Sequence, residues 1–141
     1  MKTDQLIGTY KLVCWENRDL SGEVTSPFGS DAQGVISYSA DGHVFVHLMA
    51  NGRKLHKSAE VLGGDPEEIK NSAITHLSYF GTFEVEANEV VHSIEIASFP
   101  NWVETEQRRE IEFIDDHLCL TAHGVQVGDQ KVSAHLVWHK V

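Results

Sequence analysis

Hydrophobic and polar residues alternate with a period of two along most of the chain, and turn residues interrupt this alternation at short intervals. The pattern is typical of an antiparallel all-β sandwich or barrel. A hairpin is predicted where Asp41-Gly42 joins two alternating segments. We expect about eight strands, near residues 7–16, 35–39, 43–49, 79–87, 89–98, 103–114, 117–124 and 131–141. Eight antiparallel strands can form a closed or nearly closed barrel around side chains or one small ligand.

One segment departs from the period of two and predicts a helix. Asp65 is suited to the N-cap position and Pro66 to the first helical position, with two glutamates in the first turn. Apolar residues then share one helical face as far as position 80: Ile69, Ala73, Ile74, Leu77 and Phe80. We therefore predict one amphipathic helix over residues 66–79, and we expect its apolar face to cap one end of the barrel.

Alternation also predicts which side chains point into the barrel, since successive residues of a strand face opposite sides. In the strand over residues 90–97 the apolar face takes one histidine with it, and the inward residues are Val90, His92, Ile94 and Ile96. The strand over residues 103–113 carries two polar side chains inward, in the set Val103, Thr105, Gln107, Arg109, Ile111 and Phe113. On the last strand Val132, Ala134, Leu136 and Trp138 face inward, and Tyr38 is inside if Ile36 is.

An arginine on an inward face is costly unless it is paired or partly hydrated, so these polar residues form a candidate site. His92 could shuttle a proton, and Arg109 could bind a carboxylate or stabilise an oxyanion, which makes both candidate catalytic residues. We predict a ligand-binding set of Tyr38, His92, Ile94, Trp102, Gln107, Arg109 and Trp138. The alternative is that His92 is a hydrogen-bonded core residue and that Arg109 has a structural partner.

Composition restricts the classes of partner. The 141 residues carry a formal net charge of −10, which argues against nucleic acid and anionic membrane surfaces. No targeting segment is visible. Cys14 and Cys119 lie within apolar strand patterns, so we expect them to be reduced core residues rather than a disulfide. We expect a single cytoplasmic domain spanning residues 1–141. A homodimer through an open strand edge or an apolar outer patch is left open.

Metal and cofactor sites are not predicted, although the chain has nine histidines. His43 and His47, like His135 and His139, are four residues apart on predicted strands. At about 3.3 Å per residue they lie roughly 13 Å apart, too far to share one ion. We therefore expect no metal and no cofactor.

Three segments resemble the bacterial and fungal lipocalin-like domain family: "LIGTYKLVCWE", "PFGSDAQGVISYSADGHVFVHLM" and "GTFEVEANEVVHSIEIASFPNWVETEQRREIEF". The resemblance implies a calycin-type β-barrel with a ligand-sized interior, and it implies no particular reaction. Tyr10 stands where lipocalins begin with a tryptophan, and Lys140 is expected to pack over it. The helix lies in mid-chain, unlike that of ordinary lipocalins.

Three functions are consistent with these features. The first is binding of a small hydrophobic molecule with a polar or acidic end. The second is an isomerase or cyclase of secondary metabolism that uses His92 as acid or base and Arg109 or Gln107 as oxyanion support. The third is a structural or interaction role with a packed barrel. Fold alone does not choose among them.

Overall fold

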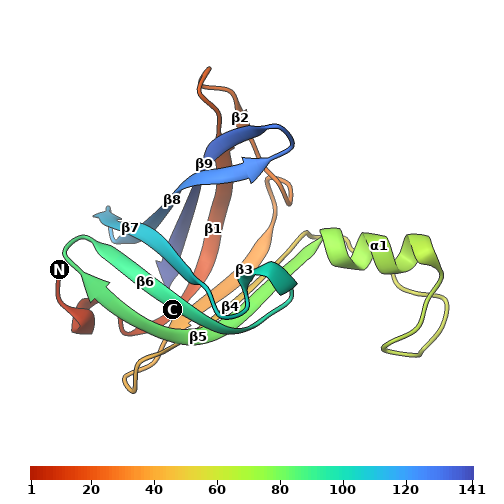
Figure 1. The fold of residues 1–141 in the computed structure, drawn as a ribbon, viewed down its shortest axis with the longest axis horizontal. Helices are drawn as coiled ribbons and strands as arrows, with labels where there is room; N and C mark the ends of the chain where they lie inside the picture. The colour runs from red at the N-terminus through yellow and green to blue at the C-terminus, as the bar shows by residue number, and fades with distance from the viewer.

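The computed structural model describes all 141 residues and is almost entirely β-structure (Figure 1). Its strands are β1 (Gly8–Arg18), β2 (Val24–Thr25), β3 (Gln33–Tyr38), β4 (His43–Met49), β5 (His76–Glu86), β6 (Glu89–Ala97), β7 (Glu106–Ile114), β8 (His117–Val127) and β9 (Gln130–Lys140). One α-helix, α1 (Pro66–Ile74), and two short 3-10 helices, η1 (Thr3–Gln5) and η2 (Pro100–Trp102), complete the chain.

Eight of the strands form a closed antiparallel barrel. Strands β3 to β9 pair in chain order, β1 pairs with β3, and β1 also pairs with β9 through residues such as Trp15 and Leu136. The predicted barrel of about eight strands is therefore confirmed. The ninth strand, β2, has two residues and pairs only with the end of β1. Closure gives both edges of the sheet a partner, which protects them from pairing with other chains.

One end of the barrel is packed solid by large side chains. Leu6 and Tyr10 are buried there, and the Tyr10 hydroxyl donates a hydrogen bond to the carbonyl of Leu6 at 2.9 Å. Lys140 lies over the ring of Tyr10, with Nζ 5.7 Å from the ring centroid, and donates to the carbonyl of Ile7 at 2.9 Å. The expected packing of Lys140 over Tyr10 is confirmed. The apolar stem and charged head of this lysine cover the aromatic ring at the barrel end.

The inward faces follow the alternation on most strands. Val90, His92 and Ile94 are buried on β6, and Tyr38 is buried together with Ile36 on β3. Arg109 of β7 and Trp138 of β9 also face the interior, since both line the cavity described below. The alternation therefore predicts the facing of these residues correctly.

Ile96 is an exception, because it was predicted to face inward and is 66% exposed. Phe80 of β5 pairs with Ile96 whereas Gly81 pairs with Ile94, so Glu95 is an extra residue in β6. Such a β-bulge reverses the alternation beyond it. Ala97 consequently packs against the core in place of Ile96.

The strand predicted from residue 103 begins only at Glu106. Residues 100–102 form η2 instead, and Glu104 has a positive φ of 62°, which interrupts an extended chain. Val103, predicted to face inward, is 41% exposed as a result. Phe113 was also predicted inward and is 42% exposed, because it lies at the barrel rim near the Asp115-Asp116 turn.

The prediction for the helix was correct at its start and wrong at its end. Asp65 accepts a hydrogen bond from the backbone of Glu68, and Pro66 is the first helical residue. The helix nevertheless ends at Ile74, and Leu77 belongs to β5. Too little apolar surface remains for docking, so no helix residue is buried and α1 extends away from the barrel rather than capping it (Figure 1).

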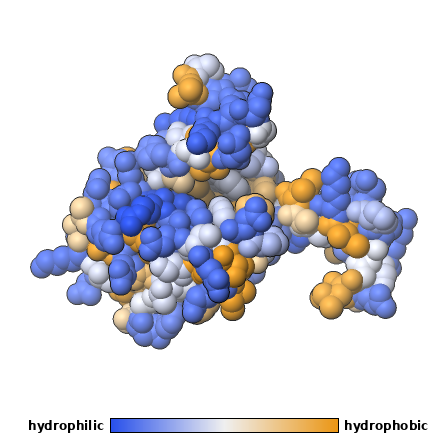
Figure 2. All heavy atoms as spheres, in the orientation of Figure 1, coloured by the Kyte–Doolittle hydropathy of each residue, from blue (hydrophilic) through white to orange (hydrophobic).

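The surface is largely hydrophilic on the face drawn in Figure 2, in keeping with the charge of the chain. Hydrophobic atoms are nevertheless visible on the projecting part that carries α1. Leu55, Val61 and Leu62 precede this helix and are each more than nine-tenths exposed. No helix of the structure is long and apolar enough to cross a membrane.

Gly81 offers a test of the bulge, because a Cβ at this position would lie 2.0 Å from the carbonyl oxygen of Ser93. A backbone atom cannot give way as a flexible side chain can. We predict that Gly81→Ala lowers the free energy of unfolding by about 3 kcal/mol or more, measured by denaturant titration. Gly22→Ala meets no atom within 4 Å and should cost only about 1 kcal/mol for its positive φ. Equal losses in the two variants would contradict this packing.

Candidate functional site

A cavity of about 680 Å³ lies inside the barrel, toward the end opposite Tyr10, and most of its lining is hydrophobic. Volume and lining are in the range of small-molecule sites. Five of the seven residues predicted to bind a ligand line this cavity: His92, Trp102, Gln107, Arg109 and Trp138. Tyr38 and Ile94 do not line it. Tyr38 lies behind His92, and Ile94 is packed in the core.

His92 is held between two tyrosines. Its Nε2 lies 2.8 Å from the hydroxyl of Tyr38, and its Nδ1 lies 2.7 Å from the hydroxyl of Tyr79. A neutral imidazole has one N–H and one lone pair, so one tyrosine accepts from the ring and the other donates to it. Tyr38 also packs edge-on against Phe83 at a centroid distance of 4.8 Å. Both ring nitrogens of His92 are therefore already in use within the protein.

Burial is the main electrostatic influence on this group. It lowers the pKa of His92 from 6.5 to about 3, and the nearby guanidinium of Arg109 adds to the effect. Burial also raises the pKa of Tyr79, against the opposing charge of Arg109, and it raises the pKa of Tyr38 well above the usual value. The three groups consequently form a neutral hydrogen-bonded unit at physiological pH.

Arg109 has no acidic partner. Its Nη1 donates to the carbonyl of Arg108 at 3.0 Å, and its guanidinium lies 5.9 Å from the ring centroid of Trp102. The adjacent Arg108 points outward and forms an ion pair with Glu86 at 2.9 Å. Alternation along β7 thus places Arg108 on the outer surface among glutamates, and it leaves Arg109 half-buried beside the cavity without an ion pair.

Two further polar groups border the cavity. Gln107 donates through Nε2 to the hydroxyl of Thr105 at 3.0 Å, which leaves its carbonyl oxygen and a second N–H for other partners. Trp138 is 1% exposed, and its indole N–H has no hydrogen-bond partner. A buried donor without a partner is uncommon in folded proteins and costs about 1–3 kcal/mol.

The cavity opens between β7 and β8. These strands pair only from Glu110 opposite Thr121 to Ile114 opposite His117. Beyond that point residues 106–109 pair with β6 alone, and β8 bulges near Gly124 and continues to pair with β9. The exposed residues Glu106, Arg108 and His123 line the cavity at this gap, so solvent can reach the interior here.

Tyr79 is the main site residue that the sequence reasoning missed. Residue 79 was predicted both as the last residue of the helix and as the first residue of a strand, and it was not predicted as a site residue; it lies within β5, lines the cavity and binds His92. The aromatic and β-branched content of residues 79–85 was the available signal for an earlier strand start. No group of three or more His, Cys, Asp or Glu side chains is arranged to hold a metal ion.

Comparison with known proteins identifies the family. A lipocalin-like domain model matches residues 7–141, and the chain therefore belongs to the lipocalin-like domain family. A 4'-hydroxy-3'-methoxypropiophenone carrier protein of Aspergillus oryzae is 30% identical to it over 103 residues. That match covers 67% of this chain and 93% of the carrier protein.

Two solved structures are similar at low sequence identity. An uncharacterised protein from Bacteroides eggerthii has a TM-score of 0.48 at 13% identity, with 96% of this chain and 99% of that chain covered. A variant of the fluorescent protein UnaG has a TM-score of 0.43 at 14% identity, with 99% of both chains covered.

The depressed pKa of His92 predicts an acid-sensitive fold. Between pH 6.5 and about 3 the unfolded chain binds a proton at this residue and the folded protein does not, so the free energy of unfolding falls as the pH falls through this window. His92→Gln keeps a donor and an acceptor for the tyrosines but does not titrate. Its loss of stability from pH 7 to pH 5 should be smaller than that of the unmodified protein by about 2 kcal/mol, measured by urea unfolding. Equal losses would show that His92 titrates normally.

Proposed function

We propose that this protein is a carrier for small, mostly apolar molecules, which it holds inside the barrel with their polar or acidic end at Arg109 and Gln107. The observation that carries the proposal is a half-buried guanidinium without an ion pair beside a largely hydrophobic cavity of about 680 Å³. Apart from its hydrogen bond to the carbonyl of Arg108, this guanidinium has no anionic acceptor, and a partly desolvated charge is costly without one. A ligand oxygen in the cavity would provide that acceptor.

The remaining lining fits the body of an aromatic ligand. Trp102 and Trp138 both line the cavity and have flat apolar faces, which favour contact with a ring. The indole N–H of Trp138 lacks a partner and would gain one from a ligand oxygen. A molecule with a ring and at least one oxygen acceptor therefore suits this cavity better than a plain hydrocarbon.

The related Aspergillus carrier supports the same chemical class. The molecule for which that carrier is named, 4'-hydroxy-3'-methoxypropiophenone, is an aromatic ketone with phenol and methoxy oxygens. Such a molecule offers a flat apolar ring to Trp102 and oxygens to Arg109 or Gln107. We infer an aromatic ketone or phenol as the ligand class, and we place the carrier in the cytoplasm, where the free Cys14 and Cys119 would remain reduced.

The isomerase or cyclase alternative has less support. An acid-base role for His92 needs a pKa near the working pH and a free ring nitrogen. Its pKa is about 3, and both of its nitrogens are bonded to tyrosine hydroxyls. His92 suits a positioning role better, because it holds the Tyr79 hydroxyl at the cavity wall.

Two adjacent arginines provide a matched test, since Arg109 lies beside the cavity without an ion pair, whereas Arg108 is exposed at the mouth of the cavity and its guanidinium is paired with Glu86. The probes are the anionic dye 8-anilinonaphthalene-1-sulfonate and the neutral dye N-phenyl-1-naphthylamine, followed by fluorescence titration. We predict that Arg109→Gln weakens binding of the anionic dye by about tenfold or more and changes binding of the neutral dye much less. Arg108→Gln should leave both affinities within about twofold, because an exposed charge is screened.

A cavity-filling variant completes the experiment. Leu136→Trp adds bulk to a residue that lines the cavity, so it should abolish binding of both dyes while thermal unfolding reports that the fold is retained. Displacement of the neutral dye by 4'-hydroxy-3'-methoxypropiophenone would support the aromatic ketone class. Equal effects of Arg108→Gln and Arg109→Gln, or undiminished dye binding by Leu136→Trp, would contradict a site inside the barrel.

A further inference from the structure

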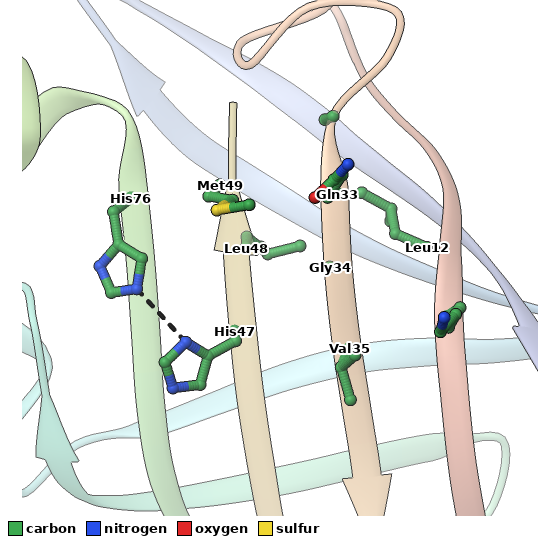
Figure 3. A pocket seen from close by; sticks show the side chains of 10 residues that line it. Leu12, Gln33, Gly34, Val35, His47, Leu48, Met49 and His76 are labelled. Carbon is green, nitrogen blue, oxygen red and sulfur yellow. Dashed lines mark hydrogen bonds between the residues drawn. The ribbon is translucent and has the colours of Figure 1, made fainter. Parts of the chain in front are cut away.

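A pair of histidines lies on the outer face of the barrel, away from the cavity. His47 is on β4 and His76 is the first residue of β5, and Nδ1 of His47 lies 3.3 Å from Nε2 of His76. Figure 3 shows the two rings turned toward each other from adjacent strands. No third residue is hydrogen-bonded to either ring.

The separation of these nitrogens matches that of two ligands on one metal ion. Imidazole nitrogens lie about 2.0–2.1 Å from a bound zinc ion. At bond angles of about 110–120° two such nitrogens are about 3.3–3.5 Å apart. The pair could therefore accept an ion between its rings with little movement, provided that each ring carries its proton on the other nitrogen.

Met49 supplies a third donor at the same place. It is the direct Cα partner of His76 across β4 and β5, and it is two residues from His47, so it shares their outer face. Figure 3 shows Met49 at the end of β4, next to the strand that carries His76. Its thioether has three rotatable bonds and can adapt to an ion between the rings.

The charges around the three donors select the kind of ion. The hollow beside them has a volume of about 440 Å³, and no carboxylate lines it. Lys11 lines this hollow, and the charge of Arg53 acts on His76. Neighbouring cations and neutral donors disfavour hard divalent ions, whereas a thioether with two imidazoles suits the soft monovalent ion Cu(I).

We propose that His47, His76 and Met49 form a Cu(I)-binding site on the outside of the barrel. The site binds one ion per chain through two imidazole nitrogens and one thioether sulfur. It is separate from the ligand cavity and does not depend on the proposed carrier function.

The test is a titration with Cu(I) alone, without oxygen, in competition with the chelator bicinchoninate. Because thiolates bind Cu(I), the experiment uses a Cys14→Ser, Cys119→Ser background. We expect one Cu(I) per chain, and at least tenfold weaker binding in His47→Ala, His76→Ala and Met49→Leu. The Met49 methyl resonance should shift on binding, and the resonance of Met1, the only other methionine, should not.

A second histidine pair serves as the control. His117 and His139 are Cα partners on β8 and β9, with ring centroids 5.6 Å apart and no hydrogen bond between the rings. Replacement of both by alanine should leave Cu(I) binding unchanged. The proposal is overturned if the protein takes no Cu(I) from the chelator, if binding survives in His47→Ala, or if Met49→Leu binds as tightly as its parent.

Discussion

The hydrogen-bonded unit of Tyr38, His92 and Tyr79 is the constraint on which the interior of this barrel depends. It lies between two unlike halves. On one side Tyr38 packs against Tyr10 and Phe83 within the hydrophobic core. On the other side Tyr79 and His92 face the cavity. Because a buried polar group is costly unless it is hydrogen-bonded, the two tyrosines keep a neutral histidine in place and fix where the packed half ends.

The strand geometry then determines the chemistry of the hollow half. Strand β7 carries consecutive arginines, and alternation sends one outward to Glu86 and the other inward beside Trp102. The loss of pairing between β7 and β8 beyond Glu110 opens the wall next to that inward arginine. The register of β7 and β8 thus brings together a charged group, a flat aromatic wall and an opening at one place.

Much of this arrangement could be predicted from alternation, and the failures have identifiable physical causes. The period-two pattern correctly predicted that His92, Arg109 and Trp138 face inward. An inserted residue moves the following side chains to the opposite face of a strand, and the strands of these three residues have no such insertion before them. Glu95 is such an insertion, so the prediction that Ile96 faces inward was wrong. The helix end was wrong because the apolar residues 77–80 fit both periods. Contacts between strands, such as Tyr79 with His92 or His47 with His76, leave no signal in the spacing of one sequence.

The central claim is that apolar ligands bind within the barrel rather than on the exposed apolar residues outside, such as Phe45 and Ile96. The most direct measurement is a two-dimensional ¹H–¹⁵N NMR spectrum recorded with and without the neutral dye N-phenyl-1-naphthylamine. We expect the largest shifts at the indole N–H signals of Trp102 and Trp138 and at the backbone of residues 106–109. Shifts confined to Phe45, Phe80 and Ile96, or to residues 55–74 around α1, with unchanged indole signals, would contradict the account.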